Sequence, residues 1–224
     1  ARLSVGVQGL AQSERSLQQA LDWARSRLQG KTHDKPGPAP IIQHPDVRRM
    51  LTRMKAYVEG MRGLQYYMGY CIDNVETTEG AEKDRWQGLL DLLIPICKGY
   101  ETDMVWDITG QAIQVYGGYG FTRDYPVEQY ARDCKIASLY EGTNGIQAMD
   151  LLGRKLGMKK GKPVMDLFGE MQKTIAAAKN IAGIEAQAVK LEAAVNKLGE
   201  VAMHLGAAAM SANVMTAFAH AHPF

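Results

Sequence analysis

A carboxylate, a glycine and two small polar residues stand together at Glu141, Gly142, Thr143 and Asn144, in a break between two helical patterns. A carboxylate projected from a loop can act as a general base, and a following glycine lets a flat substrate group lie against the main chain. Taken alone, a glutamate before a glycine is more often a solvated residue at a helix end. The residues around Glu141 are therefore needed to distinguish a general base from a solvated residue at a helix end.

A second candidate site lies upstream, where Gly117, Gly118 and Gly120 fall within four residues at the end of a long helical pattern. Glycine adopts left-handed backbone angles at little cost, and the exposed main chain at such a corner can hold polar or anionic atoms closely. The simpler interpretation is a helix C-cap, which short glycine runs often form. Arg27 is a further candidate, because a forked guanidinium suits phosphate, although a cation at a helix end is often only solvated.

Residues 117–147, GGYGFTRDYPVEQYARDCKIASLYEGTNGIQ, resemble the C-terminal signature of the acyl-CoA dehydrogenase family. The resemblance covers roughly residues 2–155, including the opening helix RLSVGVQGLAQ. It implies an FAD-dependent enzyme in which Glu141 removes the α-proton of an acyl-CoA thioester and a hydride leaves the β-carbon for the flavin, giving a trans-2-enoyl-CoA. Because that proton is weakly acidic, the base is expected in a pocket that excludes water.

The same resemblance implies binding roles for further residues. Gly142 matches a substrate-contacting position, and Arg2 lies near the stretch that contacts coenzyme A. The positions that match FAD contacts are Arg27 at the pyrophosphate, Gln114, Val115, Tyr116, Gly117 and Gly118 at the adenine-nucleotide half, and Thr143 and Asn144 at the flavin. Thr143 and Asn144 could each instead cap the helix that follows them.

The chain departs from the family pattern at two positions. Several relatives have a glutamine that reaches the flavin where this chain has Gly145, and many have a cofactor-binding glutamine where it has Pro45. Proline has neither a side-chain donor nor an N–H, so that contact is expected to be lost or moved, with Gln43 as a replacement.

The resemblance also implies partners: an acyl-CoA substrate, an electron-transfer flavoprotein, and further copies of the chain in a homodimer or homotetramer, since relatives complete the FAD site with a second subunit. Three alternatives stay open. They are a flavoprotein of the same fold that binds nucleic acid and has little dehydrogenase activity, a purely structural helical module, and an acyl-CoA oxidase. The net charge of +2, with 26 basic and 24 acidic residues interspersed, argues against a nucleic-acid partner.

The bulk composition sets further limits. At 224 residues and 46% hydrophobic content, the chain can bury a substantial core, and its ends read as those of a fragment of a longer protein. Three cysteines without paired spacing argue against disulfides and favour a reducing, cytoplasmic compartment. The five histidines are scattered and predict no metal site, and no apolar run approaches the roughly 20 residues needed to cross a membrane.

Apolar residues recur at steps of three and four, which predicts an all-α fold. We expect an antiparallel bundle of long helices over residues 1–158 and an additional C-terminal helical layer over residues 159–224. The expected helices cover about residues 3–30, 45–74, 83–115, 127–139 and 144–156, followed by two long alanine-rich helices that join near Gly199. The proline-rich segment 31–43 is expected to be a loop, and no strand is expected.

Overall fold

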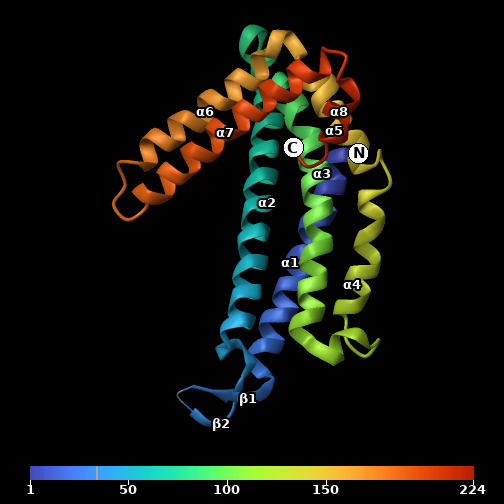
Figure 1. The fold of residues 1–224 in the computed structure, drawn as a ribbon, viewed down its shortest axis with the longest axis vertical. Coiled ribbons are helices and arrows are strands. Elements are labelled where there is room, and N and C mark those ends of the chain that lie inside the picture. Colours follow the sequence, from blue (N-terminus) through green and yellow to red (C-terminus); the bar gives the residue numbers. More distant parts are fainter. Residues whose placement is uncertain (34) are drawn as a thin grey trace. The chain divides into compact units, whose positions relative to one another are not determined.

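The computed structural model describes residues 1–33 and 35–224. Long helices form most of the described chain (Figure 1), so the predicted all-α class is confirmed. In chain order the helices are α1 (Arg2–Ser26), α2 (Pro45–Thr77), α3 (Gly80–Tyr116), α4 (Val127–Cys134), α5 (Asn144–Asp150), α6 (Lys162–Ala178), α7 (Glu185–Ala209) and α8 (Val214–Ala219).

The segment between α1 and α2 is a β-hairpin, so the prediction of a loop without strands was wrong there; Asp34, within that predicted loop, lies outside the described residues. Strand β1 (Leu28–Thr32) pairs antiparallel with β2 (Lys35–Pro40), with an irregular register. The prolines of β2 cannot donate a hydrogen bond, but a two-stranded hairpin leaves one side of each strand unpaired, which tolerates proline. The His44 imidazole Nε2 lies 2.7 Å from the Gln29 carbonyl oxygen and ties the hairpin to the start of α2.

The described chain divides into two compact units that interleave along the sequence. The first comprises residues 1–67 and 97–144, and the second comprises residues 68–96 and 145–224. Helices α2 and α3 are each divided between the two units, with one part of the helix in each unit. The division of the sequence into residues 1–158 and 159–224 stays a prediction.

In the first unit, α2 runs antiparallel to α1 and α3. Two pairings show this for α2 and α3, because Arg53 contacts Asp107 at 3.1 Å while Gln65 contacts Glu101 at 2.5 Å. One apolar core joins these helices to α4, and its buried members are Leu17, Ala20, Ala24, Ile41, Met50, Leu51, Met54, Val58, Met61, Ile108, Ala112, Val115, Tyr116 and Val127. The methionines Met50, Met54 and Met61 of α2 are therefore core residues.

The contact between α1 and α3 depends on glycine. A Cβ on Gly9 would lie 2.8 Å from the main-chain oxygen of Glu101, so the two helix backbones can approach only because Gly9 has no side chain. The face of α1 that is buried includes Gly6, Gly9 and Ser13, whereas the apolar Val7 is 48% exposed. A stripe defined by large apolar residues misses a helix face that packs through small ones.

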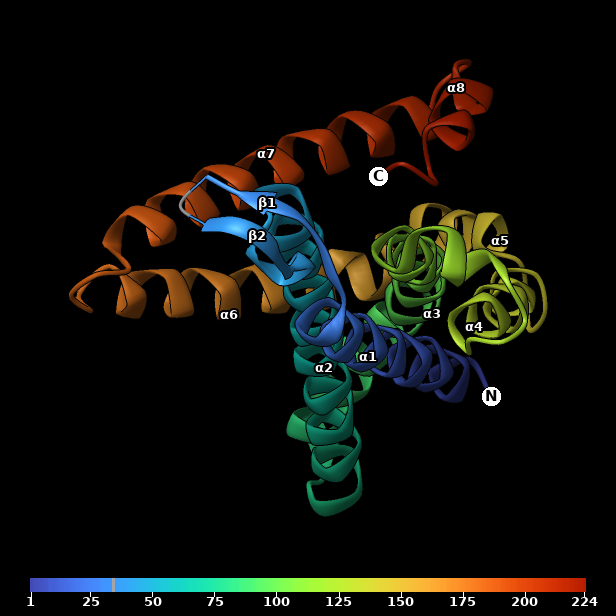
Figure 2. The same cartoon turned by 90° about the horizontal axis from the view of Figure 1, so that it is seen from below.

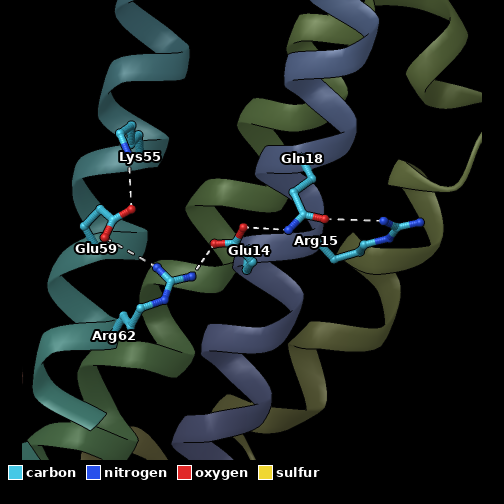
Figure 3. Close-up of polar contacts among 6 residues, drawn as sticks. All are labelled: Glu14, Arg15, Gln18, Lys55, Glu59 and Arg62. Carbon is cyan, nitrogen blue, oxygen red and sulfur yellow. Dashed lines mark hydrogen bonds and ion pairs between the residues drawn. The ribbon is translucent and has the colours of Figure 1, made fainter. Parts of the chain in front are cut away.

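A polar network links α1 to α2 on the flank of the first unit (Figure 3). Arg62 donates to Glu14 at 2.5 Å and lies 3.6 Å from Glu59, while Gln18 donates to the other oxygen of Glu14 at 2.7 Å. Burial alone would raise the pKa of Glu14, but the hydrogen bonds from Gln18 and Arg62 outweigh it and lower that pKa. The network therefore favours a charged Glu14 and fixes the axial register of the two helices.

The second unit contains the α6–α7 hairpin, whose two helices lie side by side in both views (Figures 1 and 2). Their connection spans residues 179–184 and includes Gly183 at φ +89°. Gly199, which was predicted near this join, instead lies inside α7, where its missing side chain leaves room for the ring of Phe168. A smaller apolar cluster of Leu152, Leu205, Ala217 and Ala221 holds the end of α7 and α8 together.

Candidate functional site

Glu141 lies in a tight turn of left-handed residues. Glu141 has φ +55° and Gly142 has φ +84°, and both side-chain positions are exposed. We call residues 141–143 the Glu141 loop; it follows the 3-10 turn Lys135–Ser138 and leads directly into α5. A non-glycine residue in this conformation costs on the order of 1 kcal/mol, so the rest of the structure has to hold the turn.

The support for the Glu141 loop comes from α3. The Lys98 ammonium group donates to the main-chain oxygen of Gly142 at 2.7 Å and to the side-chain oxygen of Asn144 at 2.7 Å. Lys98 is fully buried, and burial lowers its pKa while the charge of Asp103 opposes that shift. Sequence reasoning missed Lys98. The available signal was a lysine on the buried face of α3, one turn before Thr102 and two before Val105.

The side chain of Asn144 is bonded to α3. Its Nδ2 donates to the Asp103 carboxylate at 2.7 Å and to the Gly99 main-chain oxygen at 3.2 Å, while its Oδ1 accepts from Lys98. The Thr102 hydroxyl also lies 3.0 Å from Oδ1. Because a cation faces one end of the amide and a carboxylate the other, its orientation is defined. The hydrogen-bonding atoms of the Asn144 side chain are therefore engaged by α3.

The Glu141 loop lies at the level of the N-terminal part of α1. The Tyr140 hydroxyl donates to Gln8 Oε1. Arg2, half-buried in the first turn of α1, precedes Gln8 by six positions, or about 9 Å along the helix. Thr143 is exposed beside the same loop. The structure thus gathers the predicted base and the predicted substrate and flavin residues at one end of the first unit.

The glycine corner forms a separate feature at the end of α3. Gly117 has φ +65°, and both Gly117 and Gly118 are exposed with open space where a side chain would stand. Gly120 is buried, and a Cβ there would lie 2.7 Å from the main-chain oxygen of Ile113. The corner therefore needs glycine both for its backbone angles and for its close packing.

The residues that precede the corner differ in what they can offer a ligand. Gln114 is exposed, whereas Val115 and Tyr116 are buried in the core of the first unit. The Tyr116 ring stacks on Trp23 at 4.5 Å, and its hydroxyl donates to the Gln19 carbonyl. Of the predicted adenine-binding residues, only Gln114 and the main chain of the corner are accessible.

Arg27 lies beside this corner. Its guanidinium is 5.0 Å from the centre of the Tyr119 ring and 5.9 Å from that of Trp23. The corner stands at the C-terminal, negative end of the α3 dipole, which disfavours an anion at its amides. A nucleotide cofactor fits if its phosphates lie against Arg27 and its uncharged adenosine lies on the exposed glycine main chain.

The two groups of predicted residues do not converge. The Glu141 loop is bonded to Lys98, while the corner begins after Tyr116, eighteen positions further along α3. At the helical rise this corresponds to roughly 27 Å. Along α1 the order is the same, with Tyr140 at Gln8 and Tyr116 at Gln19. The predicted residues therefore form two groups at different levels of the first unit.

Among residues 1–33 and 35–224, no cluster of three or more His, Cys, Asp or Glu side chains could hold a metal ion. The three cysteines, Cys71, Cys97 and Cys134, are free and buried. No helix in the described part of the chain has the length and hydropathy needed to cross a membrane.

Comparison with known proteins gives the class. The model of the acyl-CoA dehydrogenase C-terminal domain matches residues 1–156. The chain therefore belongs to the acyl-CoA dehydrogenase family. The position of Glu141 and the glycine corner within this match agrees with the resemblance found in the sequence.

Individual relatives refine the comparison. The chain is 41% identical over 191 residues to 3-methylmercaptopropionyl-CoA dehydrogenase of Ruegeria pomeroyi, covering 81% of this chain and 32% of the relative. The butyryl-CoA dehydrogenase structure from Megasphaera elsdenii matches 69% of the chain and 36% of its own length, with 28% identity and a TM-score of 0.57. Caenorhabditis elegans ACDH-11 in complex with C11-CoA shares the fold over 93% of the chain and 34% of its own, at 18% identity and a TM-score of 0.79. The chain spans about a third of each of these relatives.

Proposed function

We propose that this chain supplies the catalytic base and part of the FAD site of an acyl-CoA dehydrogenase that converts an acyl-CoA thioester to a trans-2-enoyl-CoA. The observation that carries the proposal is the Glu141 loop: a carboxylate on a strained left-handed turn, held from behind by buried bonds to α3. Strained backbone that the surrounding structure holds in place is concentrated at functional sites, because it fixes a reactive group in one direction.

The chemistry requires removal of a proton and a hydride from neighbouring carbons. The Glu141 carboxylate takes the proton from the α-carbon, and the electron pair of that C–H bond forms the new double bond as the β-hydride leaves. FAD, when bound, supplies the acceptor for that hydride. Gly142 leaves room for the planar thioester against the main chain, and Arg2 lies at the same end of α1 for the coenzyme A part of the substrate.

Water exclusion is a requirement that the described residues do not meet by themselves, since Glu141 is exposed in this chain. The relatives are about three times as long as the matched region. We therefore assign the closing of the site to the bound flavin, the substrate and protein surface from outside this chain. Burial by these groups would make the carboxylate a stronger base.

The FAD site is proposed to involve more than one copy of the chain. Arg27, Gln114, Gly117 and Gly118 are grouped at one level of the first unit and Glu141 at another, roughly 27 Å apart along α3. This separation supports a homo-oligomer in which the corner of one copy binds the adenine half of an FAD whose flavin lies against the Glu141 loop of another. An electron-transfer flavoprotein in the cytoplasm is the proposed electron acceptor.

The test is anaerobic bleaching of the flavin in the full-length gene product. The purified protein should carry FAD, and the visible flavin absorption should disappear on adding a straight-chain acyl-CoA or 3-methylthiopropanoyl-CoA. A panel of short, medium and long acyl-CoAs identifies the substrate class. Flavin that no acyl-CoA bleaches, together with salt-sensitive retention of DNA, would instead support the nucleic-acid-binding alternative.

A further inference from the structure

The strongest unassigned feature of the first unit is the buried polar cluster beneath the Glu141 loop. Lys98, Thr102 and Asn144 are buried, and Asp103 closes the cluster towards its rim. A charged side chain removed from water needs partners, and these partners lie in the segment that carries Glu141. The cluster therefore links α3 to the loop that carries the candidate base, which lies 43 positions from Lys98 in the sequence.

We propose that Lys98 is a positioning residue for Glu141: its ammonium group fixes the main chain of the Glu141 loop at Gly142 and, through Asn144, at the start of α5. The bonds to the Gly142 oxygen and to Asn144 Oδ1 are each 2.7 Å long. Together they hold the residues on either side of Thr143. With both sides fixed, the left-handed turn at Glu141 and Gly142 has one orientation, and the carboxylate has one direction.

The second half of the cluster orients Asn144 so that it can receive Lys98. Asp103 accepts from Asn144 Nδ2 at 2.7 Å and the Gly99 carbonyl accepts from it at 3.2 Å, which turns Oδ1 towards the ammonium group. Thr102 donates to the Lys98 carbonyl at 2.7 Å and lies 2.9 Å from Nδ2. Loss of Lys98 would leave Oδ1 and the Gly142 carbonyl short of their charged donor and would free the loop to relax.

The structural half of this inference can be tested without any enzyme activity. In full-length protein, Lys98→Met keeps the length and apolar stem of the side chain but removes its donors. Amide hydrogen exchange over residues 140–146 should become about tenfold faster, while exchange in the rest of α3 and in α1 stays near wild type. Glu101→Gln is the matched control, because it changes another buried polar group of α3 that does not contact the loop, and its loop exchange should stay unchanged.

The catalytic half rests on the proposed function. Lys98→Met should keep FAD and should bind acyl-CoA with wild-type affinity, while the bleaching rate at saturating substrate falls by about 100-fold. An α-deuterated substrate should slow the remaining reaction further, since proton removal then limits the rate. A structural defect alone would instead lower FAD content and leave the bleaching rate per bound flavin intact.

The outcomes separate the two claims. If the wild-type flavin is bleached by no acyl-CoA, the proposed function fails, and hydrogen exchange still decides whether Lys98 holds the loop. Wild-type loop exchange in Lys98→Met, or a bleaching rate within about threefold of wild type, overturns the positioning role. If Lys98→Met does not fold, Thr102→Val removes only the hydroxyl beside Asn144. Amide exchange over residues 140–146 should be faster in Thr102→Val than in wild type, by a smaller factor than expected for Lys98→Met. Unchanged exchange would overturn the proposal.

Discussion

Glu101 is a fully buried acidic residue of the first unit. It lies where α1 meets α3, and its Oε2 accepts from Gln65 at 2.5 Å and from the Cys97 thiol at 3.5 Å. Its Oε1 is buried without a hydrogen-bond partner. Because burial outweighs these two bonds, the pKa of Glu101 is raised from 4.5 to about 7.

This shift predicts a stability that falls with pH. The folded state holds the Glu101 proton more tightly than the unfolded state, so the favourable contribution is complete below about pH 4.5 and is lost as pH rises towards 7. Glu101→Gln keeps the shape and cannot ionise. At pH 8 the variant should be more stable than wild type by on the order of 2 kcal/mol, and the difference should shrink at pH 5. Thermal unfolding at both pH values measures this, and parallel pH profiles would contradict it.

At the residue scale, the sequence could point to some candidate site residues and not to others. Glu141, Gly142 and the glycine corner could be proposed as site residues because they match a family motif, and their roles stay predictions. Lys98 was not found, because its role depends on a bond to a main-chain oxygen 44 positions away, which no local pattern encodes. Asn144 was assigned to the flavin by its place in the motif, yet its side chain bonds to α3.

At the scale of elements, the three- and four-residue spacing of apolar residues predicted most of the fold. The starts of α2 and α4 agree with the predicted positions, since Pro45 and Pro126 mark them. The β-hairpin was missed because alternate prolines indicate a break in a helix without distinguishing a loop from an edge strand. The join of α6 and α7 was misplaced because Gly199 lies within an alanine-rich helix that tolerates one glycine.

The packing of α1 on α3 gives the element-scale prediction. Gly9→Ala would place a methyl group 2.8 Å from the Glu101 main-chain oxygen, and neither helix backbone can move without disturbing the core. We expect a loss of about 1–3 kcal/mol in stability. Gly63→Ala on α2 is the matched control, because nothing lies within 4 Å of its added Cβ, and it should be neutral or stabilising. Equal unfolding temperatures for the two variants would contradict the proposed close contact.

At the scale of the whole molecule, the predicted site residues form two groups at different levels of the first unit, and the proposed function needs surface from outside this chain to complete the site. The Glu141 loop carries the proposed base at one level of the first unit, and Arg27 with the glycine corner forms the proposed nucleotide-binding surface at another. The sequence alone does not give their separation, since it depends on the bond between Lys98 of α3 and the Glu141 loop. The match to the family model ends at residue 156, and we propose no role for the helices that follow it.

The most direct measurement is anaerobic bleaching in Glu141→Gln, made in the full-length protein beside Glu59→Gln, which alters an exposed glutamate of α2 in the network of Figure 3. The amide keeps the shape of the side chain and cannot accept the α-proton. Glu141→Gln should retain FAD and bind acyl-CoA, with bleaching slowed by about 100-fold or more, while Glu59→Gln bleaches like wild type. Bleaching of Glu141→Gln at the wild-type rate would contradict the assignment of Glu141 as the base.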